Sequence, residues 1–313
     1  MEPKSKYVEG KLLAEGKTKR IIEVVENPNL VIIENKEDIT AHDDPGFTKK
    51  FASKAVCATT TTCRVSELLN KLGIPTAFVE QLSEAKPKVK FVAKKSSMIS
   101  LEVVVRRYAV GSYLKREPSL VQEPPFRFEE PVIEFFLKTT KGALVINGET
   151  VIDGLNPKLG EEDPLIGNPF DSEWILLHAK KPVADPESNL SRKIDKQVMA
   201  SKVLPFSDKV ASDVTMGQIR DIALCTFIAL ENAFKRIGVR FIDFKIELGV
   251  DVETGFIVIA DVIDNDSWRI RDENWQELSK ERFRQGESLD VVEQLYQLVA
   301  ELVSRPEFLG EVA

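Results

Sequence analysis

The sequence predicts an α+β fold, and three stretches of the chain carry that prediction. β-Branched segments joined by short turns fill the first hundred residues around a single helical pattern. A long amphipathic helical pattern at 215–237 is followed directly by two strand patterns at 240–251 and 255–264. Because the strands pair as hairpins and stand apart from the helices, their order favours α+β over an alternating arrangement of strands and helices.

The first third of the chain predicts a β-rich sheet with one long helix. Residues 19–26 and 30–36 predict two strands joined by an Asn-Pro-Asn turn, and the preceding LLAEGKTK predicts an earlier strand and a glycine turn. Residues 49–72 predict a helix that ends at Gly73-Ile74-Pro75. Two further strands are predicted at 89–96 and 101–110.

The middle of the chain, about 139–210, is dense in turn residues and charges and has little periodicity. It predicts surface loops or an insertion, chiefly at 139–162 and 180–192. Gly238 is expected to cap the helix at 215–237. The stretch 288–305 predicts an amphipathic helix near the C-terminus.

The composition of the 313 residues narrows the chemistry. A net charge of −7 argues against a general nucleic-acid binder, and no apolar run approaches the roughly 20 residues that span a bilayer. The three cysteines, Cys57, Cys63 and Cys225, match no common metal pattern and favour free thiols in a reducing cytoplasm. With two histidines far apart, catalysis must use Lys, Arg, Asp and Glu, which suits phosphoryl transfer.

Two basic motifs are candidate anion sites. In EGKTK, residues 15–19, a glycine turn lets the backbone approach a phosphate, and Lys17 and Lys19 add positive charge. In EVVVRRYAVGSYLKR, residues 102–116, Arg106 ends an apolar strand and Ser112 follows in a turn, a combination that suits phosphate or carboxylate. Solvated charges at an ordinary turn and at a strand end are the alternatives.

Acidic residues gather on the predicted hairpin near the C-terminal end. Asp243, Lys245 and Glu247 alternate in DFKIELGV and share one face of a strand, and Asp261 lies in the apolar pattern of the partner strand. A carboxylate inside such a strand is costly unless it is paired or bound to a metal. The charges therefore indicate a divalent cation site, an anionic substrate held by Lys245, or a structural ion-pair network.

Six motifs in one order resemble a known family. EGKTK, D-x-T-A at 38–41, VVVRRYAVGSYLKR, FFLK at 135–138, DFKIELG and ADVIDNDSWR are together similar to the SAICAR synthetases of purine biosynthesis, over about residues 8–138 and 205–303. The resemblance implies a two-lobed α+β architecture, with nucleotide-binding lobes reminiscent of ATP-grasp enzymes and kinases. It also implies a cytoplasmic carbon–nitrogen ligase that uses ATP and Mg²⁺ to join carboxyaminoimidazole ribonucleotide (CAIR) to L-aspartate.

The same resemblance implies roles for individual residues. ATP would be bound by Lys17, Lys19, Met98 and Glu247. Mg²⁺ would be held by Asp261 and Glu247, and catalysis would depend on Lys245 and Asp261. The substrates would be bound by Asp38, Asp43, Arg106, Ser112, Asp266, Arg269 and Arg284. For Arg284, near Gly286, the alternative is a solvated helix end, and for Asp38 and Asp43 it is local capping.

The sequence departs from the family pattern at two places. Val262 stands where many members carry an acidic residue after the metal-binding aspartate, and the chain could use Asp264 in its stead. Residues 139–200 are longer than the family core, although Asp163-Pro164-Leu165-Ile166 matches a family segment. We expect a nucleotide-binding lobe at 1–98 and a second lobe at 99–313 with an insertion around 139–200.

Small-molecule partners, CAIR and L-aspartate, follow from the resemblance, and a homo-oligomer is left open. A kinase-like phosphotransferase is one alternative, and the missing HRD and DFG patterns count against it. A non-catalytic nucleotide sensor is the other. A sensor needs the phosphate-binding lysines but has no use for Arg106, Ser112 and Arg269.

Overall fold

A computed structural model describes residues 6–40, 48–51, 53–82, 87–139, 143–146, 149–152, 163–170, 174, 176–182 and 216–311. The chain forms two compact units. The first comprises Met1–Ser97, Ile228–Phe241 and Gly249–Ala313, and the second comprises Met98–Phe227 and Ile242–Leu248. The N-terminal segment of the first unit ends at Ser97, and residues 249–313 group with that segment.

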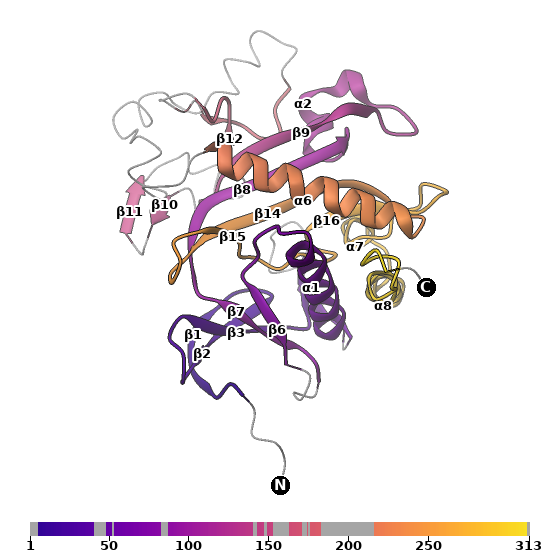
Figure 1. Ribbon diagram of the computed structural model, residues 1–313. Coiled ribbons are helices and arrows are strands. Elements are labelled where there is room, and N and C mark those ends of the chain that lie inside the picture. Colours follow the sequence, from indigo (N-terminus) through magenta and orange to yellow (C-terminus); the bar gives the residue numbers. More distant parts are fainter. Residues whose placement is uncertain are drawn as a thin grey trace. The chain divides into compact units, whose positions relative to one another are not determined.

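The first unit is built on a five-stranded antiparallel sheet (Figure 1). Its strands, in spatial order, are β1 (Glu9–Glu15), β2 (Lys19–Val24), β3 (Leu30–Asn35), β7 (Lys90–Lys94) and β6 (Phe78–Gln81). The predicted strands at 19–26, 30–36 and 89–96 are confirmed with slightly shorter bounds. The β-branched residues of β3 alternate between the two faces, so both faces of this strand are apolar and buried.

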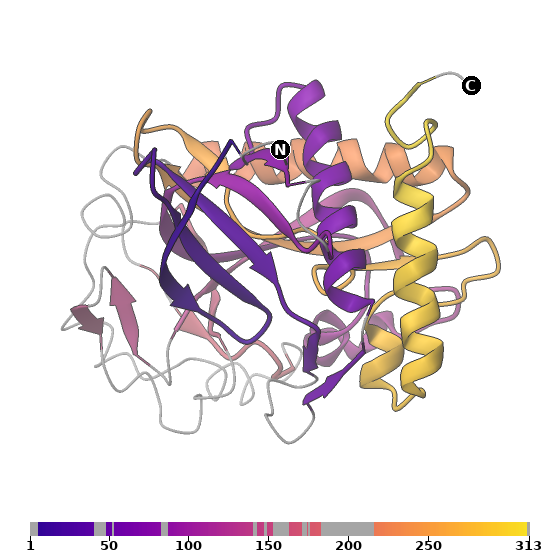
Figure 2. The ribbon, with the colours of Figure 1, turned by 90° about the horizontal axis from the view of Figure 1, so that it is seen from below.

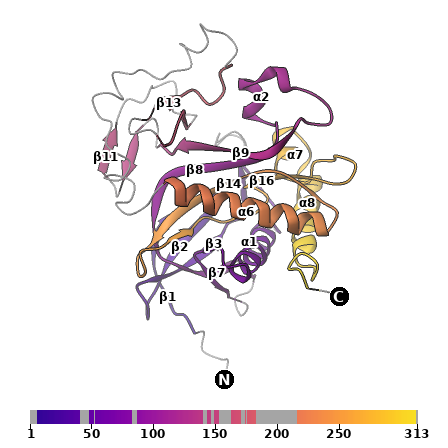
Figure 3. The same cartoon turned by 45° about the horizontal axis from the view of Figure 1, so that its top comes forward.

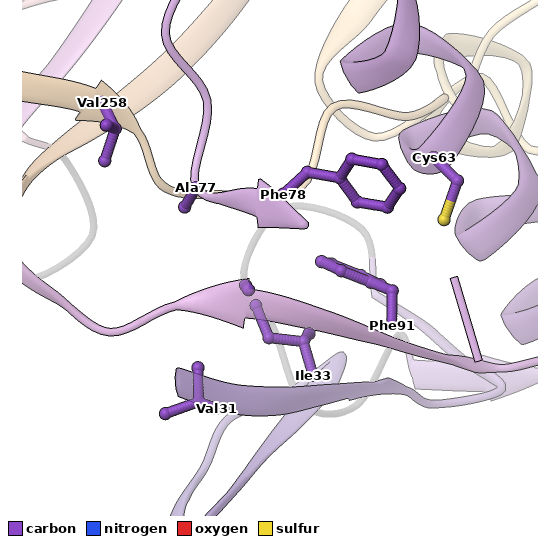
Figure 4. Packing of buried hydrophobic residues seen from close by; sticks show 8 residues of the cluster. Val31, Ile33, Cys63, Ala77, Phe78, Phe91 and Val258 are labelled. Atoms are coloured by element: carbon purple, nitrogen blue, oxygen red, sulfur yellow. The ribbon is translucent and has the colours of Figure 1, made fainter. Parts of the chain in front are cut away.

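One face of this sheet packs into a core that contains Cys63 of helix α1 (Lys54–Lys71). Figure 4 shows Ile33, Phe78 and Phe91 in this core, with the two phenylalanine rings 5.9 Å apart. Figure 2 shows α1 beside α8 (Leu289–Val303), which confirms the predicted C-terminal helix. A short helix, α7 (Glu281–Arg284), precedes α8.

Helix α1 begins five residues later than the sequence predicts. The predicted start at residue 49 is wrong because Thr48–Lys50 forms β5, which pairs antiparallel with β4 (Asp38–Thr40). Backbone hydrogen bonds to β4 take priority here over the helical propensity of Lys49 and Lys50. Ile39 and Phe51 then pack against Val292 and Tyr296 of α8.

The second unit contains most of a seven-stranded sheet of order β13-β12-β9-β8-β14-β15, with β16 (Trp268–Arg271) also paired to β14. The other strands are β8 (Ser96–Tyr108), β9 (Arg127–Leu137), β12 (Leu165–Ile166), β13 (Leu176–Leu177), β14 (Arg240–Asp251) and β15 (Ile257–Ile259). Both ends of β14 belong to the first unit. Strands β10 (Leu144–Ile146) and β11 (Glu149–Ile152) form a separate hairpin within the region expected to be loop-rich.

The two faces of the second unit's sheet differ in character. Helix α6 (Met216–Arg236), the long orange helix of Figure 3, confirms the predicted helix. Its Phe227 packs edge-on against Phe244 of β14, with the ring centroids 5.6 Å apart. On the other face of the sheet, Val104 of β8 and Phe136 of β9 pack against Leu165 and Ala179. That second face also carries the charged residues of β8 and β14, described below. The short helices α2 (Ser112–Arg116) and η2 (Pro118–Leu120) follow β8.

The predicted hairpin is confirmed on its first strand and corrected on its second. Strand β14 has the predicted bounds, whereas β15 ends at Ile259, so Asp261 does not lie in a strand. The Asp261 carboxylate accepts the backbone N–H of Val262 at 2.7 Å, a local hydrogen bond that competes with strand pairing. No described helix is long and apolar enough to cross a membrane.

Candidate functional site

The turn between β1 and β2 carries the two lysines of the EGKTK motif. The Gly16 N–H donates to the Lys19 carbonyl at 2.9 Å, which closes the turn. Lys36 of the neighbouring chain segment donates to the Gly16 carbonyl at 3.2 Å and to Glu15 at 3.0 Å. Lys17 is exposed on this turn. Lys36 therefore fixes the turn through Glu15 and Gly16, while Lys17 faces solvent.

Lys19 forms an ion pair with Asp261, 242 positions further along the chain. Both side chains are about three-quarters buried, with 25% and 23% of their area exposed. A small, largely apolar pocket lies beside Asp261, and Ile33, Ala93, Ile259 and Ala260 are among the residues that line it. The pocket is small and shares Ile33 and Ala93 with the buried core of this unit. A cationic side chain and a carboxylate thus meet at its edge, and these are the charge types that bind phosphates and a metal ion.

The segment after Asp261 is held by charged residues from other elements. Asp266 lies 3.4 Å from Lys54 and 3.3 Å from Lys280 and accepts the hydroxyl of Tyr296. Burial works against ionisation of Asp266, but Lys54 and Lys280 outweigh it and hold the pKa of Asp266 well below its usual range. Burial raises the pKa of neighbouring Asp264 to about 6, and the charge of Asp266 adds to that rise.

Two predicted substrate-binding arginines share one carboxylate in the first unit. Arg269, on β16, donates to Glu281 at 3.2 Å, and Arg284, on α7, donates to the same carboxylate at 2.9 Å. The two guanidinium groups keep the pKa of Glu281 low, although burial opposes them. The structure therefore brings Arg269 and Arg284 together around Glu281.

The charged face of the second unit carries three ion pairs from β14 at every second residue. Lys245 donates to Glu102 of β8 at 2.6 Å, and Glu247 accepts from Lys138, which follows β9. Asp243 pairs with Arg106 of β8. The predicted alternation of Asp243, Lys245 and Glu247 on one face is thus seen in their partners, which come from the same side of the sheet.

Arg106 lies within a buried network of four charged groups. It donates to Glu134 at 2.8 Å and to Asp243, and Glu134 also accepts from Arg116. Two guanidinium groups and two carboxylates balance in charge, and Arg106 is only 4% exposed. Its remaining nitrogen, Nη2, points to the hydroxyl of Ser112 at 3.4 Å. The ion-pair network that the sequence left as one alternative is therefore present at Asp243.

Three further residues were predicted to bind ATP or substrate, namely Met98, Asp38 and Asp43. Met98 is 46% exposed at the start of the second unit. Asp38 forms ion pairs with Lys36 at 3.7 Å and Lys50 at 3.6 Å. Asp43 lies outside the described residues.

The carboxylates offer a limited set of metal ligands. Among the described residues, no group of three or more His, Cys, Asp or Glu could hold a metal ion. Asp261 and Glu247 belong to different units, and Asp264 is buried with Oδ1 accepting the Asp266 N–H at 2.8 Å. A single, partly exposed carboxylate such as Asp261 suits Mg²⁺, which typically takes one or two protein carboxylates and completes its shell with water and phosphate.

Sequence reasoning missed the residues that hold these side chains in place. They are Lys54, Glu102, Glu134, Lys138, Lys280, Glu281 and Tyr296. Glu102 and Lys138 lie at the ends of two motifs given above, EVVVRRYAVGSYLKR and FFLK, and Glu281 lies three residues before Arg284, so proximity to predicted residues was a usable signal. Lys54 and Tyr296 have no local signal, because they lie 212 and 30 positions from Asp266 in the sequence, respectively.

The structure defines an α+β protein in which charged side chains from distant parts of the chain form paired clusters, and comparison with known proteins identifies its family. The family model described as SAICAR synthetase matches residues 12–155 and 178–301. The chain therefore belongs to the SAICAR synthetase family, and the resemblance inferred from its motifs is confirmed.

Curated relatives and solved structures agree with this assignment. The chain is 31% identical to a phosphoribosylaminoimidazole-succinocarboxamide synthase of Chloroflexus aurantiacus, over 95% of this chain and 97% of that protein. It is 36% identical to the bifunctional purine synthesis protein purC/E of Dictyostelium discoideum, over 86% of this chain but only 22% of that protein. A solved SAICAR synthetase in complex with ADP matches the fold with a TM-score of 0.64 at 23% identity, over 93% of this chain and 97% of that one. The predicted α+β class is thereby confirmed.

Proposed function

We propose that this chain catalyses the reaction for which its family is named, the ATP-dependent ligation of CAIR and L-aspartate to SAICAR, with release of ADP and phosphate. The observation that carries the proposal is the pairing of Lys19 with Asp261 beside an apolar pocket, in a chain whose motifs and family match are those of SAICAR synthetases. A full-length relative with that name supports it. The ADP complex of a structural neighbour supports the use of ATP.

We assign the nucleotide to Lys17, Lys19, Met98 and Glu247. Lys17 and Lys19 would bind the phosphates of ATP, because both are basic and lie on a closed glycine turn. Met98, whose side chain is nearly half exposed, would contact the adenine, and Glu247 would contact the ribose or its metal. The partial exposure of these side chains supports access by a ligand.

Magnesium is proposed at Asp261, with Glu247 as the second carboxylate. The residues fit, because each is an acidic side chain already paired with one lysine that ligand binding can displace or share. When bound, Mg²⁺ neutralises the charge of the transferring phosphoryl group and orients it. In the absence of the cation, Lys19 holds the Asp261 carboxylate in position.

We assign CAIR to the basic or hydroxyl groups of Arg106, Ser112, Lys245, Arg269 and Arg284 and to the carboxylate of Asp266. Asp38, which lies on β4, and Asp43 are assigned to substrate as well. The network around Arg106 supports a specific geometry. Its Nε and Nη1 are occupied by Glu134 and Asp243, so Nη2 and the Ser112 hydroxyl form the edge that a phosphate or carboxylate would approach. A guanidinium fixed by two carboxylates loses little entropy on binding an anion.

The chemistry requires activation of a carboxylate. A carboxylate oxygen of CAIR attacks the γ-phosphorus of ATP and ADP leaves, which produces an acyl phosphate. The aspartate amine then attacks the acyl carbon, phosphate leaves with the former carboxylate oxygen, and the amide nitrogen loses a proton. Lys17, Lys19 and Lys245 would stabilise the charge that builds on the transferred group. No cysteine or serine nucleophile is required, and the reducing cytoplasm expected for a chain with three free cysteines suits this pathway.

The test is release of ADP by the purified protein with ATP and Mg²⁺, with CAIR and L-aspartate omitted in turn and the amide product followed by mass spectrometry. ADP release that requires both acceptors and yields SAICAR supports the proposal. Release with CAIR alone would separate acyl phosphate formation from amine addition. Folded protein that binds ATP and releases no ADP under any combination would favour a nucleotide sensor and refute the proposal.

A further inference from the structure

Lys54 is an unusual residue for the first position of a helix, because its charged side chain is buried. It is 2% exposed, whereas lysine is almost never buried unless it is paired. Burial alone would lower the pKa of its ammonium group, but the carboxylates of Asp266 and Asp264 outweigh that effect and raise it. The side chain is thus a buried cation whose position depends on those two aspartates.

The N-terminal end of α1 is fixed by α8, so Lys54 has little freedom to move. Ser53, which precedes Lys54, donates through its N–H and its hydroxyl to Glu293 of α8. Tyr296, one turn further along α8, donates its hydroxyl to Asp266, and its ring centroid lies 5.8 Å from the Lys54 ammonium. Lys54 and α8 therefore converge on the same carboxylate.

Asp266 in turn determines the path of the segment between Asp261 and Arg269. The Asp266 N–H donates to Asp264 at 2.8 Å, and the Asp264 N–H lies 3.3 Å from the Ser267 hydroxyl. The same hydroxyl donates to the Val262 carbonyl at 3.1 Å. A series of local hydrogen bonds thus links Asp266 to Val262, the residue that follows Asp261.

We infer that Lys54 is a positioning residue for the ligation reaction. By pairing with Asp266 from a buried position, Lys54 fixes the segment that carries Asp261 at one end and Arg269 at the other. The inference rests on the proposed function, because it assumes that those two residues meet the metal and the substrate. The residues that the family resemblance assigns to ATP, Mg²⁺ and the substrates do not include Lys54.

The local charges give the expected consequence of losing Lys54. Lys54 and Lys280 face Asp264 and Asp266, with Asp38 and Arg284 further out. Removing Lys54 leaves two buried carboxylates beside one lysine, and like charges in a low-dielectric site repel each other or take up a proton. Either response shifts the segment and displaces Asp261.

The first experiment compares Lys54→Met with Lys71→Met, an exposed lysine on the same helix. Methionine keeps the length and apolar character of the buried stem but has no charge. We expect Lys54→Met to lower kcat/KM for CAIR by about 10- to 100-fold, the range typical of a lost positioning partner, while Lys71→Met matches the unaltered protein. Activity of Lys54→Met within twofold of Lys71→Met would overturn the inference.

A second variant separates the charge from packing. Lys54→Ala leaves a cavity that butylamine can enter as a cation and that butanol, of similar shape, can enter only as a neutral molecule. We expect butylamine to restore activity in a saturable way and butanol to have no effect. Equal rescue by both, or rescue by neither in folded Lys54→Ala, would show that Lys54 serves only packing.

If the Lys54 variants do not fold, Tyr296→Phe tests the same contact from α8. This change removes one hydrogen bond to Asp266 and keeps the ring. It should cause a smaller loss of kcat/KM for CAIR.

The same assays distinguish failure of this inference from failure of the proposed function. If neither the unaltered protein nor Lys71→Met forms SAICAR, the proposed function is wrong. If both are active and Lys54→Met is equally active, the proposed function stands and only the role of Lys54 is refuted.

Discussion

Asp261→Asn separates a catalytic role from a structural one, because the structure assigns very different magnitudes to the two. Asparagine keeps the size of the side chain and can still accept the Val262 N–H. It removes the negative charge that pairs with Lys19, and both partners of that pair are about a quarter exposed. Partly exposed ion pairs contribute about 1 kcal/mol or less, so unfolding should become easier by no more than that amount.

The catalytic effect should be far larger. If Asp261 holds the cation that neutralises the transferring phosphoryl group, its loss should cost about 3–4 kcal/mol of transition-state stabilisation, or roughly 100- to 1,000-fold in kcat. In a chain of this size, 1 kcal/mol corresponds to a shift in Tm of about 2–4 °C or less. The expected loss of transition-state stabilisation, about 3–4 kcal/mol, is therefore several times the expected loss of folding stability, about 1 kcal/mol or less.

The assay pairs steady-state SAICAR formation with a thermal melt, with Mg²⁺ varied in both. Asp221→Asn on the exposed side of α6 is the matched control, because Asp221 is an exposed aspartate paired with an exposed arginine. EDTA should abolish turnover of the unaltered protein, and added Mg²⁺ should restore it. Normal turnover of Asp261→Asn with unchanged Mg²⁺ dependence would refute the metal assignment, and a loss of several kcal/mol of stability would show a mainly structural role.

Two further predictions concern buried groups. Arg116→Met should lower the free energy of unfolding by about 3–5 kcal/mol, because it leaves two buried carboxylates, Glu134 and Asp243, beside the single guanidinium of Arg106. Arg116→Met/Glu134→Gln should recover part of that loss. Urea unfolding followed by circular dichroism measures both variants, and equal losses would contradict the charge argument. Burial raises the pKa of the Cys57 and Cys63 thiols, so Ellman's reagent should react quickly with Cys225 alone in the native protein and with all three thiols in denaturant; rapid native reaction of three thiols would contradict the described core.

The sequence predicted the elements whose patterns are local. Strand β14 has the predicted bounds, and α6 and α8 differ from prediction by one or two residues at each end, because their apolar periodicity is sustained over many residues. The errors come where a distant segment competes. The start of α1 moved because residues 48–50 pair with β4, and β15 stopped early because Asp261 bonds to its own neighbouring backbone.

The site divides in the same way. Sequence motifs named Lys19 and Asp261 separately, but no sequence rule pairs residues 242 positions apart. Arg106 was predicted as part of an anion site, and the structure adds that two carboxylates already hold its guanidinium group. Lys54 gave no signal, because a lysine at the start of a helix normally lies in solvent and its burial depends on the tertiary position of Asp266.

The most direct measurement follows the oxygen atoms of CAIR. With both carboxylate oxygens labelled as ¹⁸O, ligation through an acyl phosphate transfers one labelled oxygen to phosphate and leaves the other in the amide of SAICAR. We predict that mass spectrometry finds one ¹⁸O in the released phosphate for every SAICAR formed. ADP and SAICAR accompanied by unlabelled phosphate would contradict the acyl phosphate, and the absence of SAICAR would contradict the proposed function itself.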